Sequence, residues 1–151
     1  MLKYLVLGLL GAIVALGVYV RLAPSSPSVW HKTFPPQSPG QRQLAGGYQI
    51  VLKAAAPEAT LVALDALIMA TPRTTRLAGA PAEGMTTYVT RSRVFGFPDY
   101  TTVWAGPDDT DEGGHGPLLK IEGRLRFGKS DMGVNRARIE GWLTQLSEAQ
   151  T

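Results

Sequence analysis

Hydrophobic and charged residues alternate most regularly between Leu119 and Phe127. The apolar or small positions are Leu119, Ile121, Gly123, Leu125 and Phe127, and the charged ones are Lys120, Glu122, Arg124 and Arg126. Successive side chains of a strand point to opposite sides, so this pattern predicts a half-buried strand. Alternation or a Thr-, Tyr- and Val-rich composition predicts further strands at 48–53, 74–78, 86–95 and 100–105, with a turn at 96–99.

Two other segments carry apolar residues three or four positions apart, which is the spacing of an amphipathic helix. The first opens at Pro57, ends before Pro72 and has an apolar face of Leu61, Leu64, Leu67 and Ile68. The second follows Ser130 and Asp131, whose side-chain oxygens can accept the free amides of a helix start. Its apolar stripe is Met132, Ile139, Trp142, Leu143 and Leu146.

Asn135 falls on the stripe of the second helix, so we expect a buried amide there. It either ties the helix start to a neighbouring segment or lines a pocket.

The order of strand, helix, three or four strands and helix predicts an α+β fold. We expect a two-layer sandwich in which two helices cover one face of a mostly antiparallel sheet and the other face is polar and open.

The N-terminal segment predicts a membrane anchor. Residues 4–20 carry no charge and stand between Lys3 and Arg21, which gives the shortest length that spans a bilayer. Arg21 also breaks the small-residue pattern that signal cleavage near Ala23 would need. We therefore expect a transmembrane helix at 1–22 with the N-terminus in the cytoplasm, a stiff proline-rich linker at 23–47 and a globular domain at 48–151.

Two aromatic residues interrupt the linker. Trp30 and Phe34 either pack on the globular domain or rest at the membrane interface.

Composition excludes several classes of function. A formal charge of +3, dispersed along the chain, does not imply a nucleic-acid partner. The absence of cysteine excludes disulfides and thiolate chemistry. Residues 123–130 formally fit a phosphate loop, but the strand pattern continues through them and too little chain follows for the rest of such a fold. Asp108 to His115 lack the order of a calcium loop, so we expect no metal and no cofactor.

Arginines are the main candidates for binding. Arg91 shares a parity with Arg93, and Arg124 with Arg126, so we expect guanidinium groups on the open sheet face. Such groups match carboxylate and phosphate oxygens, although a solvated strand face is the alternative. The predicted ligand-binding residues are Asp99, Arg124, Arg126, Ser130, Asp131 and Asn135, converging at the opening of the last helix.

These residues favour a non-catalytic binding domain for an anionic ligand or a protein partner. Neighbouring arginines are expected to lower the pKa values of Asp99 and Asp131, which argues against a general acid. Two alternatives remain open: a small hydrolase with Asp131 or Asp99 as base, and an assembly subunit without a ligand pocket.

Two stretches, RSRVFGFPDYTTV at 91–103 and GRLRFGKSDMGVNRARIEGWLTQL at 123–146, resemble the bacterial family of domains of unknown function 1499 (DUF1499). The specific parts are the turn at Phe95 to Asp99 and the segment Ser130 to Asn135. The resemblance implies an envelope protein, which we expect in the inner membrane with a single span and a periplasmic domain. It brings no activity, and it suggests that the turn and the helix start form one shared feature.

Overall fold

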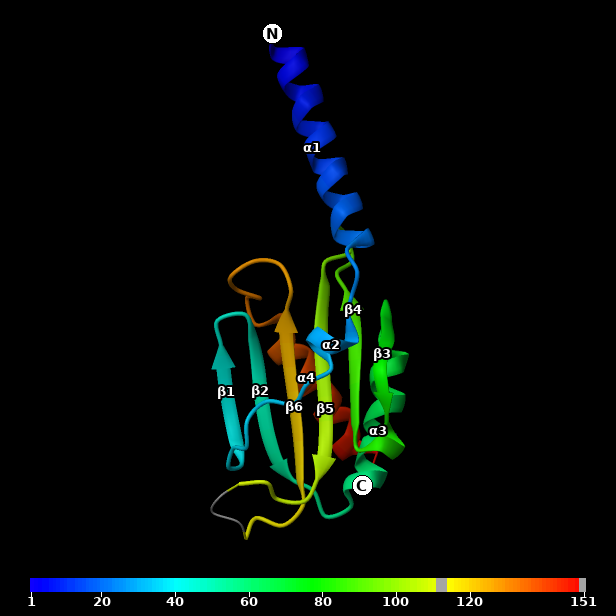
Figure 1. The fold of residues 1–151 in the computed structure, drawn as a ribbon, viewed down its shortest axis with the longest axis vertical. Coiled ribbons are helices and arrows are strands. Elements are labelled where there is room, and N and C mark those ends of the chain that lie inside the picture. The colour runs from blue at the N-terminus through cyan, green and yellow to red at the C-terminus, as the bar shows by residue number, and fades with distance from the viewer. Residues whose placement is uncertain (111–113, 150–151) are drawn as a thin grey trace.

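A six-stranded antiparallel sheet is the centre of the fold in the computed structural model, which describes residues 1–110 and 114–149 (Figure 1). The strand order is β1-β2-β6-β5-β4-β3. In chain order the strands are β1 (Gly40–Leu44), β2 (Gly47–Lys53), β3 (Thr74–Ala80), β4 (Met85–Arg91), β5 (Pro98–Gly106) and β6 (Leu118–Leu125). A 3-10 turn, η1 (Pro81–Glu83), links β3 to β4.

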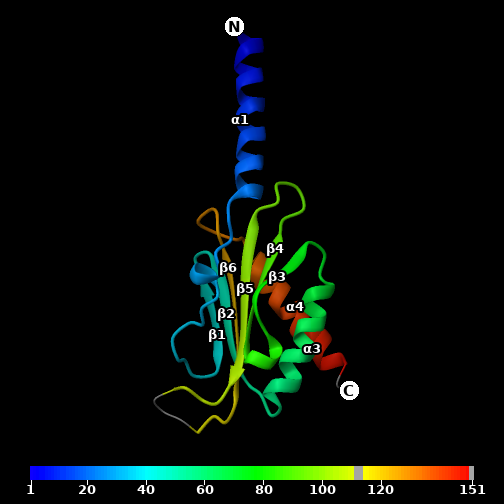
Figure 2. The same ribbon diagram turned by 45° about the vertical axis from the view of Figure 1, so that its right-hand side comes forward.

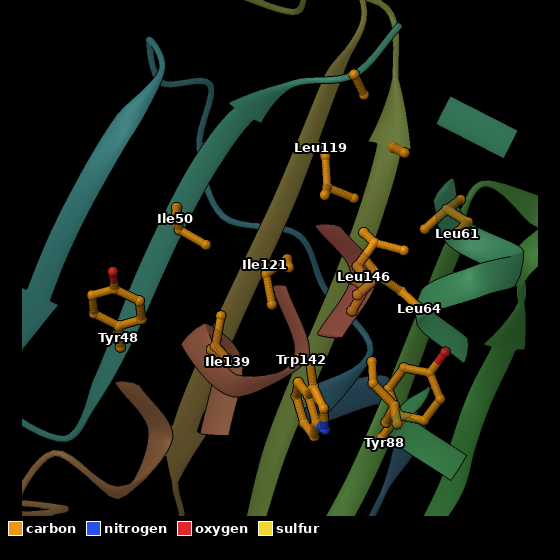
Figure 3. Close-up of a cluster of buried hydrophobic side chains, with 14 residues drawn as sticks. Tyr48, Ile50, Leu61, Leu64, Tyr88, Leu119, Ile121, Ile139, Trp142 and Leu146 are labelled. Atoms are coloured by element: carbon orange, nitrogen blue, oxygen red, sulfur yellow. The ribbon is translucent and has the colours of Figure 1, made fainter. Parts of the chain in front are cut away.

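Helices α3 (Pro57–Ala70) and α4 (Val134–Glu148) cover one face of the sheet (Figure 2). Between the helices and the sheet lies the apolar core (Figure 3), whose buried members include Tyr48, Ile50, Leu61, Leu64, Tyr88, Ile121, Ile139 and Trp142. The Trp142 indole donates a hydrogen bond of 2.8 Å to the Thr71 hydroxyl beyond the end of α3, so the two helices are joined at a fixed place. The predicted two-layer α+β fold is confirmed.

Helix α1 (Leu2–Leu22) extends away from the domain, and Val20 is its one buried residue (Figure 1). Its mean hydropathy of 2.3 over the most apolar window and its length make it a helix that could span a membrane. A helix of this length is about 30 Å long, which matches the hydrocarbon core of a bilayer.

The opposite face of the sheet is not open, which corrects the expectation from the sequence. Residues 23–39, here called the strap, run across it and include the short helix α2 (Pro27–Trp30). The Trp30 ring stacks on Tyr100 with centroids 3.8 Å apart and planes 8° apart. Phe34 is buried beside Val51 and Leu118. Both aromatic residues therefore pack on the domain.

Several element boundaries also differ from the sequence prediction. Strand β1 lies inside the stretch expected to be a linker, because its partner β2 offers a free edge to residues 40–44. Strand β4 ends at Arg91, so the turn before β5 is longer than predicted. Met132, expected on the apolar stripe of α4, is 90% exposed and has φ of 50°. It precedes the helix, which starts at Val134.

Candidate anion-binding site

Arg124 on β6 and Arg126, just beyond the end of that strand, point to the sheet face that carries the strap. Arg124 donates hydrogen bonds to the Trp30 carbonyl (2.7 Å) and the Thr102 hydroxyl (2.9 Å). Arg126 donates to the Pro24 carbonyl (2.9 Å) and the Tyr100 hydroxyl (3.2 Å). The two guanidinium groups thus fasten the strap to the sheet, and a large part of their donor capacity is already used.

Ser130 and Asp131 organise the approach to α4. The Asp131 carboxylate accepts the backbone amides of Gly133 (3.2 Å) and Asn135 (3.0 Å), and the Ser130 hydroxyl accepts the amide of Met132 (3.2 Å). Burial raises the pKa of Asp131, but its hydrogen bonds, chiefly those with Asn135 and Gly133, together outweigh it, so this pKa lies below its usual value. The predicted direction is right, but hydrogen bonds at the helix start, and not neighbouring arginines, cause the shift. The predicted role at the helix start is confirmed.

Asn135 is fully buried on the helix side of the sheet, against Gly123. Its amide oxygen accepts a hydrogen bond of 3.0 Å from Arg138, whose other terminal nitrogen donates to the Asp99 carboxylate at 3.3 Å. The first turns of α4 are therefore linked to the start of β5. Arg138 was not predicted; its position three residues after Asn135 on the same helix face was the available signal.

The pKa of Asp99 is shifted in the opposite direction to the prediction. Burial raises it, and the opposing influence of Arg138 is smaller.

The six predicted residues do not converge, because strand alternation separates them. Gly123 faces α4, so the neighbouring Arg124 must face the strap. Asp99, Asp131 and Asn135 lie with α4 on one side of the sheet, while Arg124 and Arg126 lie on the other. The expected single binding surface is thus divided into two sets of contacts that each hold the fold together.

A different group of arginines lines one pocket of about 470 Å³. Its wall consists of Arg21, Arg73, Thr75, Arg91, Ser92, Arg93 and Gly96. We call this the arginine pocket. Arg91 and Arg93 were both noted in the sequence, but they were grouped with Arg124 and Arg126. Arg73 joins them because Thr74 pairs with Thr90, which brings the residue before β3 beside Arg91.

Three of the four guanidinium groups in the arginine pocket are positioned by backbone carbonyls. Arg73 donates to the carbonyl of Arg91 (3.0 Å), Arg91 to that of Gly96 (2.9 Å) and Arg21 to that of Val94 (3.3 Å). Arg73 also has φ of 61°, a conformation that costs energy in a residue with a side chain and that its contacts with β4 maintain. The side chains are therefore held in place before any ligand arrives.

The charge of the arginine pocket is not neutralised within the described parts of the chain. In residues 1–110 and 114–149, every carboxylate that lies within 4.0 Å of a basic side chain has a partner outside the arginine pocket, for example Arg76, Lys120 or Arg138. Four guanidinium groups around one hollow without a carboxylate form a site for an anion such as phosphate, because each can donate two parallel hydrogen bonds.

The described residues of the acidic loop, which connects β5 to β6, do not form an anion site. Asp108 accepts hydrogen bonds from Thr110 and His115, and these bonds hold its pKa well below the usual range. Asp111 and Glu112 lie outside the described residues. Within residues 1–110 and 114–149 no group of three His, Asp or Glu side chains could hold a metal ion.

The fold and contacts define a small α+β domain behind an N-terminal helix that could cross a membrane. The family model described as "Protein of unknown function (DUF1499)" matches residues 36–146, and the chain belongs to this family. No curated protein matches the chain. The matched range begins before β1 and ends inside α4, so it includes the strand that the sequence prediction had placed in the linker.

Proposed function

We propose that this protein is a membrane-anchored, non-catalytic domain of the bacterial envelope that binds an anionic ligand in the arginine pocket. The observation that carries the proposal is the set of four guanidinium groups around one pocket, none of them beside a carboxylate in the described residues.

Electrostatics support an anion rather than a neutral ligand. Like charges that share a small space repel one another, and the repulsion is relieved when an anion enters. A hydrogen bond to a charged group contributes about 1.5–3 kcal/mol, so two or three such bonds give measurable affinity at low salt. The pocket is open to solvent, since Arg21, Arg73 and Arg93 are all exposed, and a ligand can enter without rearrangement.

The membrane location is part of the proposal and is supported by the length and apolar surface of α1. We place the chain in the inner membrane as a single span, with the N-terminus in the cytoplasm and the domain in the periplasm. Because the chain contains no cysteine, one introduced by Glu58→Cys gives a unique label. A membrane-impermeant maleimide should label it in cells with a permeabilised outer membrane. Labelling only after cell lysis would refute the periplasmic placement.

Anion binding is tested on the full chain in a non-ionic detergent by thermal unfolding with phosphate, pyrophosphate, sulfate or citrate. A ligand present at 100 times its Kd stabilises the folded state by about 2.7 kcal/mol, which moves Tm by several degrees. Pyrophosphate should raise Tm at low salt, and the rise should disappear in the double variant Arg73→Gln/Arg93→Gln.

The matched control removes the same charge outside the arginine pocket. Lys32→Gln/Lys53→Gln alters two exposed lysines and should keep the full response to pyrophosphate. Wild-type protein that responds to none of the four anions would refute the proposed function. An equal loss of response in the lysine variant would show that net charge, and not the pocket, is responsible.

A further inference from the structure

The arginine pocket lies at the end of the helix that could span the membrane. Arg21 belongs to the last turn of α1, and it donates to the carbonyl of Val94 in the β4–β5 turn at 3.3 Å. An added Cβ on Gly96 in the same turn would lie 3.0 Å from the Arg21 side chain, so the two segments are in contact. The β4–β5 turn reaches the level of the last turn of α1 (Figure 2).

The turn presents apolar side chains beside the pocket. Val94 is 70% exposed and Phe95 is 48% exposed. Ring contacts continue from Phe95 through Phe97 and Phe127 to Tyr19 in α1, with centroid distances of 5.7, 5.9 and 6.1 Å. Membrane proteins commonly place aromatic rings and arginines, next to exposed apolar side chains, at the boundary between the hydrocarbon core and the lipid headgroups.

The length of the uncharged segment sets the depth of the pocket. Residues 4–20 rise by about 1.5 Å each, so they cover about 25 Å of a hydrocarbon core that is about 30 Å thick. Arg21 then lies at the boundary where lipid phosphates begin, and the β4–β5 turn lies at the same depth because it touches Arg21.

We infer that the arginine pocket binds the phosphate of an anionic phospholipid of the bilayer that α1 crosses, with Val94 and Phe95 inserted beside it. This inference rests on the proposed function, because it names the source of the anion. Hydrogen bonds to backbone carbonyls hold the guanidinium groups of Arg21, Arg73 and Arg91 around the headgroup. Arg93, for which the described residues provide no hydrogen bond or ion pair, can turn toward the headgroup.

The insertion of the turn is tested with the full chain in nanodiscs. A spin label on Val94→Cys reports its depth through its accessibility to oxygen and to a water-soluble nickel reagent. The same label on Ala82→Cys in η1, at the far end of β4, is the matched control. In phosphatidylglycerol nanodiscs the label at 94 should be at least fivefold more accessible to oxygen, relative to nickel, than the label at 82.

The lipid itself is tested in detergent by titration with a short-chain phosphatidylglycerol, with short-chain phosphatidylcholine and with glycerol phosphate. The anionic lipid should bind at least tenfold more tightly than either of the others. Arg73→Gln/Arg93→Gln should weaken it at least tenfold, while Lys32→Gln/Lys53→Gln should change it less than twofold. Arg93→Gln alone, at an exposed side chain, serves as the second variant if the double variant does not fold.

The outcomes separate this inference from the proposed function. Equal binding of glycerol phosphate and the short-chain lipid, with a water-exposed label at 94, overturns the lipid inference and leaves anion binding intact. Absence of binding to every anion, including pyrophosphate, overturns both. Binding of phosphatidylcholine as tight as that of phosphatidylglycerol overturns the assignment to an anionic lipid.

Discussion

The contact between Gly123 on β6 and Asn135 on α4 provides the sharpest test of the fold around the helix start. A Cβ added at Gly123 would lie 2.8 Å from both the Cβ and the amide oxygen of Asn135. Carbon atoms in good contact are about 3.5–4.0 Å apart, so Gly123→Ala must push α4 away from the sheet by most of an ångström.

Two opposing contributions decide the sign of this effect. In a strand without close neighbours, replacing glycine by alanine stabilises by about 0.5–1 kcal/mol, because the unfolded chain loses freedom. Overpacking of a well-filled interior costs about 1–3 kcal/mol. We therefore expect Gly123→Ala to destabilise the domain by about 1 kcal/mol net, which lowers Tm by roughly 3–5 °C in a domain of this size.

Gly141 on α4 is the matched control, since an added Cβ there meets nothing within 4 Å. Gly141→Ala should raise Tm, because alanine is favoured over glycine in a helix by about 1 kcal/mol. Both variants are measured by circular dichroism of the full chain in detergent. A Tm of Gly123→Ala above that of the wild type would show that α4 does not approach β6 at this glycine, and the argument would be wrong.

The remaining predictions concern the strap and the two acids. Arg124→Gln/Arg126→Gln should lower Tm by several degrees, because each hydrogen bond from a charged group contributes about 1.5–3 kcal/mol, less where it is exposed. This double variant should keep the rise in Tm with pyrophosphate. Loss of that rise would show that the anion binds on the sheet face under the strap and not in the arginine pocket. Asp131 has a lowered pKa, so its stabilisation exists above its usual pKa near 4 and is lost as pH falls. The Tm advantage of wild type over Asp131→Asn should therefore shrink between pH 6 and pH 3. Asp99 has a raised pKa, so the folded state takes up its proton first, and wild type should gain on Asp99→Asn over the same range. Melting curves across this range check both, and parallel curves would contradict them.

The core helices and strands were predictable because their apolar side chains recur at the spacing of a strand or a helix. The alternation from Leu119 to Phe127 predicted β6, and the spacing of Leu61, Leu64 and Ile68 predicted α3. The hydrogen bonds that Asp131 accepts from amides at the start of α4 and the burial of Asn135 followed from the same kind of local argument. Each of these features depends on neighbours within a few residues in the sequence.

The strap and the arginine pocket could not be read in this way, because they depend on contacts between distant segments. Prolines in residues 23–39 indicate an extended chain but not the surface on which it lies. Arg21, Arg73 and Arg93 meet only after β3 pairs with β4 and the strap sets the position of α1. Parity within a strand identified Arg124 and Arg126 correctly as facing one side, but not that backbone carbonyls of the strap would occupy them.

The strap also determines how far the protein can reach. The stacking of Trp30 and the hydrogen bond from Arg124 hold this proline-rich segment flat on the sheet. It therefore cannot act as a flexible tether, and the domain stays close to the end of α1. If α1 crosses a bilayer, as proposed, the domain can contact only partners that lie within about one domain length of the lipid surface. A partner therefore has to approach the membrane surface before it can bind the domain.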